Sequence, residues 1–236
     1  MYTRIIFYSI FFYLFVIAAK AQPTNNQVRL FDDDWQFFRG GSQRAETVTF
    51  DDSKWRRIDL PHDWSIEDLP GTNSPFNPAA ISQVNGGFTT GGTAWYRKTF
   101  TIPAAQKEQK TIIQFDGIYM NAEVWLNGKP VGNHRYGYTS FWYDITGYLN
   151  YDSANVLAVK VKNEGENSRW YSGSGIYRHV WLKVIAPVHI AQWGTYITTP
   201  EVTAAAARVV VKTKVQNQSG RAADVTIVTR IRSAKG

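Results

Sequence analysis

The chain of 236 residues contains no cysteine. This absence excludes disulfide bonds, thiol catalysis and thiolate metal sites. A secreted chain without disulfides must be stabilised by its packed core, and a chain of this length can bury one. Basic residues outnumber acidic ones, 26 to 19, but they are scattered and form no long run. The charge therefore gives no indication of a nucleic-acid partner.

The sequence also lacks an apolar run long enough to span a bilayer. Arg4 precedes an apolar run over residues 5–19, whereas a membrane-spanning helix needs about 20 residues. Ala19-Lys20-Ala21 has the small-x-small form of a cleavage site. We therefore predict a signal peptide over residues 1–21 and a periplasmic or secreted protein without a stable membrane anchor. A single transmembrane anchor is the alternative.

Helical patterns are nearly absent, and short alternating patterns take their place. Ala122, Val124 and Leu126 alternate with Glu123, Trp125 and Asn127, and residues 156–161 behave similarly. Period two indicates β-strands, and the Asn-Gly pair within Leu126–Gly132 predicts a type I′ hairpin. Strand signals about every ten residues predict an all-β chain with an antiparallel sandwich or jelly roll.

Two segments interrupt this pattern. Residues 69–92 hold Pro70, Pro75 and Pro78 without periodicity, and a loop of this length in a compact domain is often functional. Residues 185–188 resemble a domain boundary. Strand patterns then resume, and we expect a hairpin turn over Val215–Val225, between strands at Val209–Val215 and Val225–Ile231.

Aromatic residues make up 15% of the chain, and several lie in the segment NSRWYSGSGIYRHVWL, residues 167–182. Aromatic faces stack on sugar rings, an arginine fork binds hydroxyls or carboxylates, and glycines permit close backbone approach. The alternative is a tight turn whose aromatic side chains belong to the core. The run V-W-L-K-V that follows predicts a strand.

Several segments together resemble glycoside hydrolase family 2, which includes β-galactosidases, β-glucuronidases and β-mannosidases. Besides residues 167–182, the segments that carry this resemblance are Asp32–Gly40, Trp55–Asp68, Gly91–Pro103, Phe115–Thr146 and Asn155–Asn163. They follow one another in the order typical of the family, and the closest resemblance is to its β-galactosidase-like members. The resemblance covers roughly Val28 to Val184, the amino-terminal sugar-binding domain.

The resemblance implies a domain order. We expect a sugar-binding jelly-roll domain over residues 22–186, followed by a partial immunoglobulin-like domain over residues 187–236. A whole immunoglobulin-like domain needs about 100 residues, so the second domain is expected to be truncated. The fold expected for the chain is thus a jelly-roll-like antiparallel β-sandwich followed by the start of an immunoglobulin-like β-sandwich.

The resemblance also implies a function: the amino-terminal part of a retaining exo-β-glycosidase, with β-galactosidase as the first choice. In the family both catalytic glutamates lie on a downstream barrel, so we expect no catalytic residue, metal site or cofactor in this chain. The expected partners are a β-galactoside-type glycan and that barrel, and homo-oligomerisation is left open. The alternatives are a non-catalytic carbohydrate-binding module and a structural or adhesion domain.

The candidate substrate-binding residues are Arg169, Trp170, Asn167 and Asp63. The resemblance places the loop that bears Arg169 at the mouth of the barrel, where its guanidinium would bind sugar hydroxyls. His62 and Asp63 are adjacent and could suggest a catalytic dyad, but the sequence has no serine in a recognisable nucleophile motif. The pair is therefore interpreted either as a structural turn with Trp64 buried or as part of the active-site rim.

The run Asp32-Asp33-Asp34 is interpreted as a charged strand start or turn. A metal site is the alternative, but the run lacks the glycine and the terminal glutamate of a calcium-binding loop.

Overall fold

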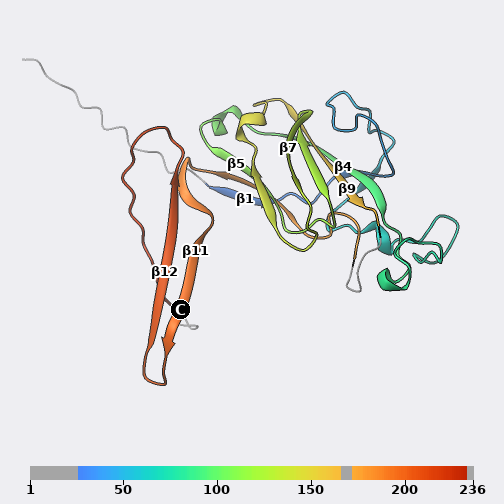
Figure 1. Ribbon diagram of the computed structural model, residues 1–236. Coiled ribbons are helices and arrows are strands. Elements are labelled where there is room, and N and C mark those ends of the chain that lie inside the picture. The colour runs from blue at the N-terminus through green and yellow to red at the C-terminus, as the bar shows by residue number, and fades with distance from the viewer. Residues whose placement is uncertain (1–25, 166–171, 233–236) are drawn as a thin grey trace, which may run out of the picture.

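The computed structural model describes residues 26–165 and 172–232, which form a two-sheet sandwich followed by a hairpin. The larger sheet has the order β3 (Arg56–Ile58), β2 (Trp35–Arg39), β4 (Gly92–Thr101), β9 (Ala154–Asn163), β6 (Ala122–Leu126) and β7 (Lys129–His134). The smaller sheet has the order β1 (Gln27–Leu30), β10 (Val180–Ile185), β5 (Lys110–Phe115) and β8 (Phe141–Asp144). The hairpin consists of β11 (Val188–Val202) and β12 (Ala207–Asn217), which extend away from the sandwich (Figure 1).

Every pairing between these strands is antiparallel, which confirms the all-β prediction. The helices of the described residues are four single 3-10 turns. They are η1 (Trp64–Ile66), η2 (Val84–Gly86), η3 (Ala104–Gln106) and η4 (Thr146–Tyr148). Among the residues with assigned structure, no helix has the length and apolar character needed to cross a bilayer.

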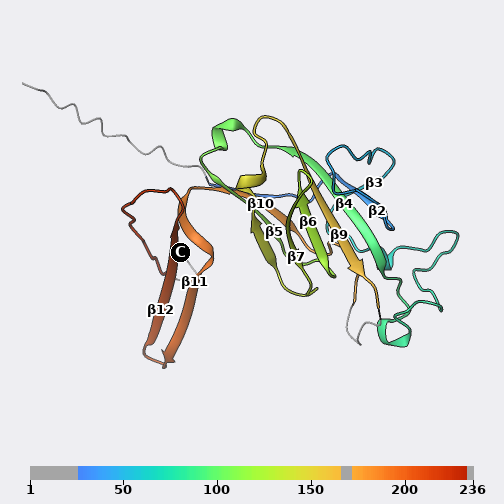
Figure 2. The ribbon, with the colours of Figure 1, turned by 45° about the horizontal axis from the view of Figure 1, so that its top comes forward.

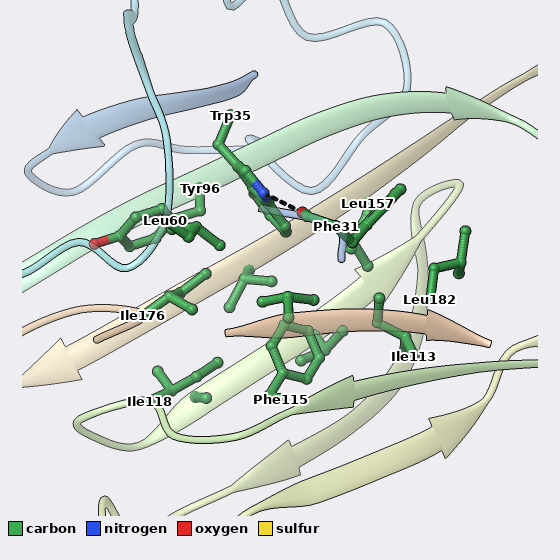
Figure 3. Close-up of a cluster of buried hydrophobic side chains, with 14 of the residues drawn as sticks. Phe31, Trp35, Leu60, Tyr96, Ile113, Phe115, Ile118, Leu157, Ile176 and Leu182 are labelled. Carbon is green, nitrogen blue, oxygen red and sulfur yellow. Dashed lines mark hydrogen bonds between the residues drawn. The ribbon is translucent and has the colours of Figure 1, made fainter. Parts of the chain in front are cut away.

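The main core lies between the two sheets and is rich in aromatic side chains (Figure 3). Trp35, Tyr96 and Phe115 are fully buried there, and the indole Nε1 of Trp35 donates to the carbonyl of Phe31 at 2.8 Å. On β6 the predicted alternation is confirmed, because every second residue from Ala122 to Leu126 is buried. Burial of such large side chains stabilises the folded state of a chain that has no disulfides.

The turn between β6 and β7 has the geometry that its sequence predicts. Asn127 and Gly128 have φ values of 54° and 77°, and two consecutive positive φ values are those of a type I′ turn. The Asn127 side chain also accepts from the Val156 backbone N–H and donates to the Tyr148 carbonyl. The hairpin prediction is thus confirmed, and the same residue ties the turn to β9.

A second, smaller core lies on the outer face of the larger sheet, under residues 40–55. Trp95 of β4 packs there with Ala45 and Ala158. Arg97 is also buried, and its Nε donates to Asp52 at 2.7 Å while Nη1 donates to the carbonyl of Thr47 at 3.0 Å. A buried guanidinium requires such partners, so this arginine holds the covering loop in place.

The loop over residues 69–92 lies beside the end of β9 (Figure 2). It contains η2 and is crossed by a single bridge between Phe76 and Thr89. Two large apolar side chains of this loop, Ile81 and Val84, are exposed to solvent, and neighbouring exposed apolar residues often mark a contact surface.

The hairpin prediction beyond the sandwich was wrong in its second strand. The segment Val209–Val215 does lie in a strand, but its partner is β11, and residues 222–232 form no strand. Side chains of Ile227 and Ile231 instead line a groove with residues of β11 and β12. Alternating β-branched residues mark a tendency to form strands, whereas a strand also needs a partner in register, and residues 222–232 pair with no other described strand.

Candidate functional site

Two segments far apart in the sequence meet at one end of the sandwich. The backbone N–H of His62 donates to the carbonyl of Ile176 at 2.9 Å, and that of Trp64 donates to the carbonyl of Ser174 at 3.0 Å. Residues 62–67 and 172–176 therefore lie side by side. The second segment follows directly on the residues expected to bind sugar.

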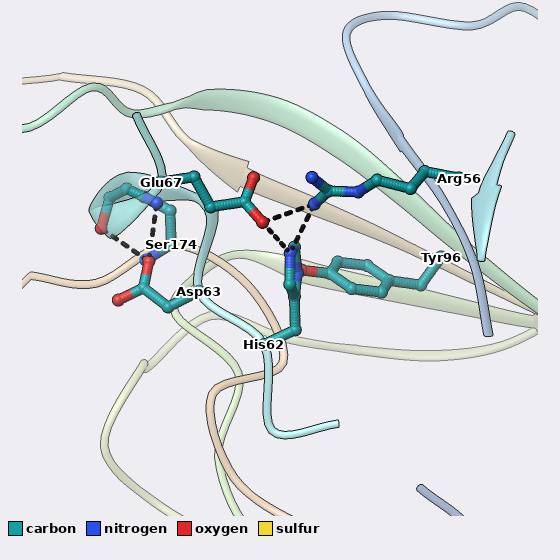
Figure 4. A network of polar contacts seen from close by, with 7 residues as sticks. Arg56, His62, Asp63, Glu67, Tyr96 and Ser174 are labelled. Atoms are coloured by element: carbon teal, nitrogen blue, oxygen red, sulfur yellow. Dashed lines mark hydrogen bonds and ion pairs between the residues drawn. The ribbon is translucent and has the colours of Figure 1, made fainter. Parts of the chain in front are cut away.

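The Asp63 carboxylate joins these two segments (Figure 4). Its Oδ1 accepts hydrogen bonds from the backbone N–H of Ser65 at 2.8 Å and from the Ser65 hydroxyl at 2.6 Å. The same atom accepts from the backbone N–H of Ser174 at 2.7 Å, across 111 positions of sequence. Asp63 is buried, so these charge-assisted bonds are made away from water and fix the position of Ser174.

Glycine is required at position 175 by space and by backbone conformation. Its φ is 132°, which favours glycine. A Cβ built there would lie 2.6 Å from the carbonyl oxygen of His62 and also overlap the Tyr96 hydroxyl. The close contact between the two segments therefore depends on the missing side chain at Gly175.

His62 connects the buried interior to a surface ion pair. Its Nδ1 lies 2.7 Å from the Tyr96 hydroxyl, and its Nε2 lies 2.9 Å from Oε1 of Glu67. Burial raises the pKa of Tyr96 well above its usual value, so the phenol keeps its proton and can donate it to Nδ1. Nε2 of the neutral ring lies 2.9 Å from Glu67 Oε1 and also 2.9 Å from Arg56 Nη2. An Nε2–H tautomer donates to Glu67, whereas a bare Nε2 accepts from Arg56.

Burial also lowers the pKa of His62, and this outweighs the opposing effect of the hydrogen bond to Glu67. For Glu67, burial alone would raise the pKa, but hydrogen bonds from Arg56 and His62 together lower it. Arg56 Nη2 lies 2.5 Å from Oε1 of Glu67. At neutral pH the site therefore holds a neutral imidazole between a charged pair and a buried phenol.

A pocket of about 250 Å³ adjoins this contact and is lined by the 69–92 loop and the end of β9. Ser82 and Thr89 line it from the loop, and Asn163 and Glu164 line it from β9. Asn163 is buried, and its Nδ2 donates to the Ser174 hydroxyl at 2.8 Å. The pocket wall is mainly apolar with a few polar side chains, which is usual for a small-molecule site.

The sugar binding domain of glycosyl hydrolases family 2 matches residues 29–186 of the chain. The chain belongs to this family. The beta-galactosidase BoGH2A of Bacteroides ovatus is 46% identical over 207 residues, which are 87% of this chain and 24% of that protein. A beta-glucuronidase of Formosa agariphila is 29% identical over an alignment of 238 positions, which covers 92% of this chain and 23% of that protein.

The fold is also that of a solved family 2 member. A glycosyl hydrolase family 2 structure from Bacteroides cellulosilyticus matches with a TM-score of 0.78 and 54% identity, over 81% of this chain and 25% of that chain. The chain thus spans about a quarter of the length of the relatives it matches. This agreement supports the family 2 sandwich.

Three of the four candidate sugar-binding residues of this family 2 chain, Asn167, Arg169 and Trp170, lie outside the described residues. The fourth, Asp63, is buried and makes the contacts given above, so a direct role in binding sugar stays a prediction. The expected domain boundaries also stay predictions. Residues 186–187 do fall between the end of β10 and the start of β11.

The turn with a buried Trp64 that one interpretation of His62-Asp63 expects is present, and a place on the active-site rim stays a prediction. Trp64 is fully buried, and Asp63 caps the 3-10 turn that begins there. The imidazole of His62 lies within hydrogen-bonding distance of Tyr96, Glu67 and Arg56.

The aspartate run has structural partners. Asp32 accepts from the backbone N–H of Val180 at 2.8 Å and lies 2.7 Å from Nδ1 of His179. Asp34 accepts from Nε of Arg57 at 2.7 Å. Within residues 26–165 and 172–232, no three His, Cys, Asp or Glu side chains cluster as metal ligands would. The interpretation as a charged turn before β2 accounts for these contacts.

Sequence reasoning missed Ser65, Ser174, Glu67 and Tyr96 as parts of the site. For Ser65 a local signal existed, because an aspartate two residues before a serine often caps a short helical turn. Glu67 lies in the same segment as Asp63, but its ion pair with Arg56 forms only in the folded chain. Ser174 and Tyr96 come from segments that meet residues 62–67 only after folding, and no spacing in the sequence connects them to Asp63.

We predict that Asp63→Ala lowers the free energy of unfolding by about 1–3 kcal/mol, because the N–H groups of Ser65 and Ser174 lose a buried acceptor. Urea unfolding followed by fluorescence measures this change. Asp63→Asn keeps one carbonyl oxygen and should recover part of the loss. The matched control Asp68→Ala removes an exposed carboxylate and should change stability by less than about 0.5 kcal/mol. Equal effects of Asp63→Ala and Asp68→Ala would contradict the assignment.

The lowered pKa of His62 predicts a pH dependence of stability. An unfolded histidine titrates near pH 6.5, so between that pH and the lower folded pKa the unfolded state binds more protons. The free energy of unfolding should therefore fall as the pH drops below about 6.5. His62→Gln should make this decline shallower, as measured by urea unfolding at several pH values between 7 and 5.

Burial also lowers the pKa of His134, which contributes in the same pH window. The comparison is therefore made on a His134→Gln background. Glu67 does not interfere, because its lowered pKa means that its contribution is lost only below its ordinary value of 4.5. An unchanged pH slope after replacement of His62 would show that the imidazole is not held neutral by the fold.

Proposed function

We propose that this chain supplies the sugar-binding domain of a retaining exo-β-glycosidase, with β-galactosidase activity as the first assignment. The observation that carries the proposal is the buried contact from Asp63 to Ser174, which holds the polypeptide immediately after residues 167–170 against residues 62–65. A loop that binds sugar needs such support, because binding groups are effective only when their position is fixed. The 46% identity to a beta-galactosidase supports the first assignment.

In the proposed enzyme, Arg169 donates hydrogen bonds to hydroxyls of the terminal sugar, and Trp170 and Asn167 contact the same ring. Asp63 is proposed as a further residue of this subsite, and it positions residues 172–176, which follow these residues in the chain. Hydrolysis with retention requires two carboxyl groups, one as nucleophile and one as acid and base. By resemblance to the family, these are two glutamates of a downstream barrel, which is the proposed partner of this domain together with the glycan.

We predict that Arg169→Ala in the full-length protein lowers kcat/KM by about 30- to 1000-fold, or about 2–4 kcal/mol, because a charged hydrogen bond to the substrate is lost. Hydrolysis of nitrophenyl β-galactoside, β-glucuronide and β-mannoside measures the effect and selects the sugar. Arg221→Ala, a change of an exposed arginine outside the sandwich, serves as the control. An unchanged kcat/KM in folded Arg169→Ala protein would refute the role.

The same assay addresses the alternatives. Relatives described as beta-glucuronidases make glucuronide the second substrate to test. Binding of sugars by the full-length protein without turnover of any of the three glycosides would favour a non-catalytic carbohydrate-binding module.

The protein is further proposed to be exported to the periplasm or the medium through cleavage after Ala21. The apolar run and the Ala19-Lys20-Ala21 site support this proposal. N-terminal sequencing of the protein from its native host should therefore begin at Gln22. Recovery of residues 1–21 on the mature protein would instead favour a retained membrane anchor.

A further inference from the structure

Four tyrosines gather at the end of the sandwich that carries the candidate site. Tyr119 and Tyr138 meet edge to face with ring centroids 5.2 Å apart, and Tyr136 and Tyr138 do so at 5.6 Å. The hydroxyl of Tyr177 donates to the carbonyl of Gly137 at 2.9 Å. We call Tyr119, Tyr136, Tyr138 and Tyr177 the tyrosine cluster.

The inner part of the tyrosine cluster fixes the outer part. Tyr119 is buried, and burial together with the hydrogen bond to Tyr138 raises its pKa to about 12, so it stays neutral. A Cβ at Gly137 would overlap the ring of Tyr119, so the 135–138 segment approaches closely only because this residue is glycine. Tyr136 and Tyr138 are 59% and 39% exposed on this rigid base. Such exposure is uncommon for two adjoining aromatic rings on a folded surface.

The tyrosine cluster is directly connected to the candidate site. The backbone of Gly175 exchanges two hydrogen bonds with that of Tyr119, both at 2.9 Å. Its neighbour Ser174 is the residue held by Asp63. The tyrosines and the proposed sugar-binding loop therefore share one short segment, residues 172–177.

A positive charge accompanies the rings. Arg178 follows Tyr177, is exposed, and passes its aliphatic part close to Gly117, beside the tip of Tyr177. In the part of the chain that the structure describes, its guanidinium has no ion pair. Arg178 is connected to the exposed rings through Tyr177, whose hydroxyl meets the backbone between Tyr136 and Tyr138. A surface that combines an arginine, phenol groups and aromatic faces matches a sugar ring, which has an apolar face and a polar edge.

We propose that Tyr136, Tyr138 and Arg178 bind a second sugar unit of the substrate, on the leaving-group side of the bond to be cleaved. The ring of that sugar stacks on Tyr136, and Arg178 donates hydrogen bonds to its hydroxyls or carboxylate. This inference rests on the proposed function and makes the natural substrate an oligosaccharide. A protein partner is the less favoured occupant, because the surface combines rings with hydrogen-bonding groups and adjoins residues 172–177.

The test compares two substrates of the full-length protein. β-Galactosyl fluoride has a leaving group too small to reach the tyrosines, whereas β-1,4-galactotetraose extends past the cleaved bond. We expect Tyr136→Ala to lower kcat/KM for the tetrasaccharide about tenfold more than for the fluoride, and Arg178→Gln to act in the same direction. Tyr196→Ala, on β11, removes a tyrosine of similar exposure and should leave the ratio unchanged. An equal effect of Tyr136→Ala on both substrates would overturn the proposal.

A binding measurement separates this proposal from the proposed function. If the protein hydrolyses neither substrate, nor the corresponding glucuronides, saturation-transfer NMR with galactotetraose and with a β-linked glucuronic acid oligosaccharide still reports contact. Binding of either probe that is lost in Tyr136→Ala supports the inference. Binding of neither probe, or binding that Tyr136→Ala does not change, overturns it.

Discussion

A single carboxylate oxygen joins the two segments on which the candidate site is built. Oδ1 of Asp63 accepts from Ser65 within its own turn and from Ser174 in a segment 111 residues away. In a chain without disulfides this contact must be maintained by hydrogen bonds and packing alone. The carboxylate is buried, so the loss of a protein partner would leave it unsatisfied at a large cost in free energy. The relative position of the two segments is therefore strongly specified.

The surroundings of Asp63 explain how this contact is held. Trp64 is buried against the core beside it, and Gly175 permits the approach of the opposite backbone. On the other side, His62 lies between the Tyr96 phenol and Glu67, with a lowered pKa that keeps it neutral at pH 7. Packing, steric room and a defined protonation state thus act together to hold the two segments in contact.

The structure also shows why a β-sandwich is suited to holding loops in fixed positions. The strands and their aromatic core supply a rigid base, while residues 62–67 and 172–177 lie in loops at one end. The pocket beside Asn163 and the tyrosine cluster flank residues 172–177 from two sides.

The sequence alone determined the all-β class, the alternation on β6 and the type I′ turn at Asn127-Gly128, because these depend on residues adjacent in the chain. It also predicted the structural turn at His62-Asp63, and its motifs indicated the family. It could not determine the pairing of β12 with β11, nor the convergence of Ser174 and Tyr96 on residues 62–67. Those contacts join distant segments, and their energies depend on burial and on steric room that exist only after the sheets have packed.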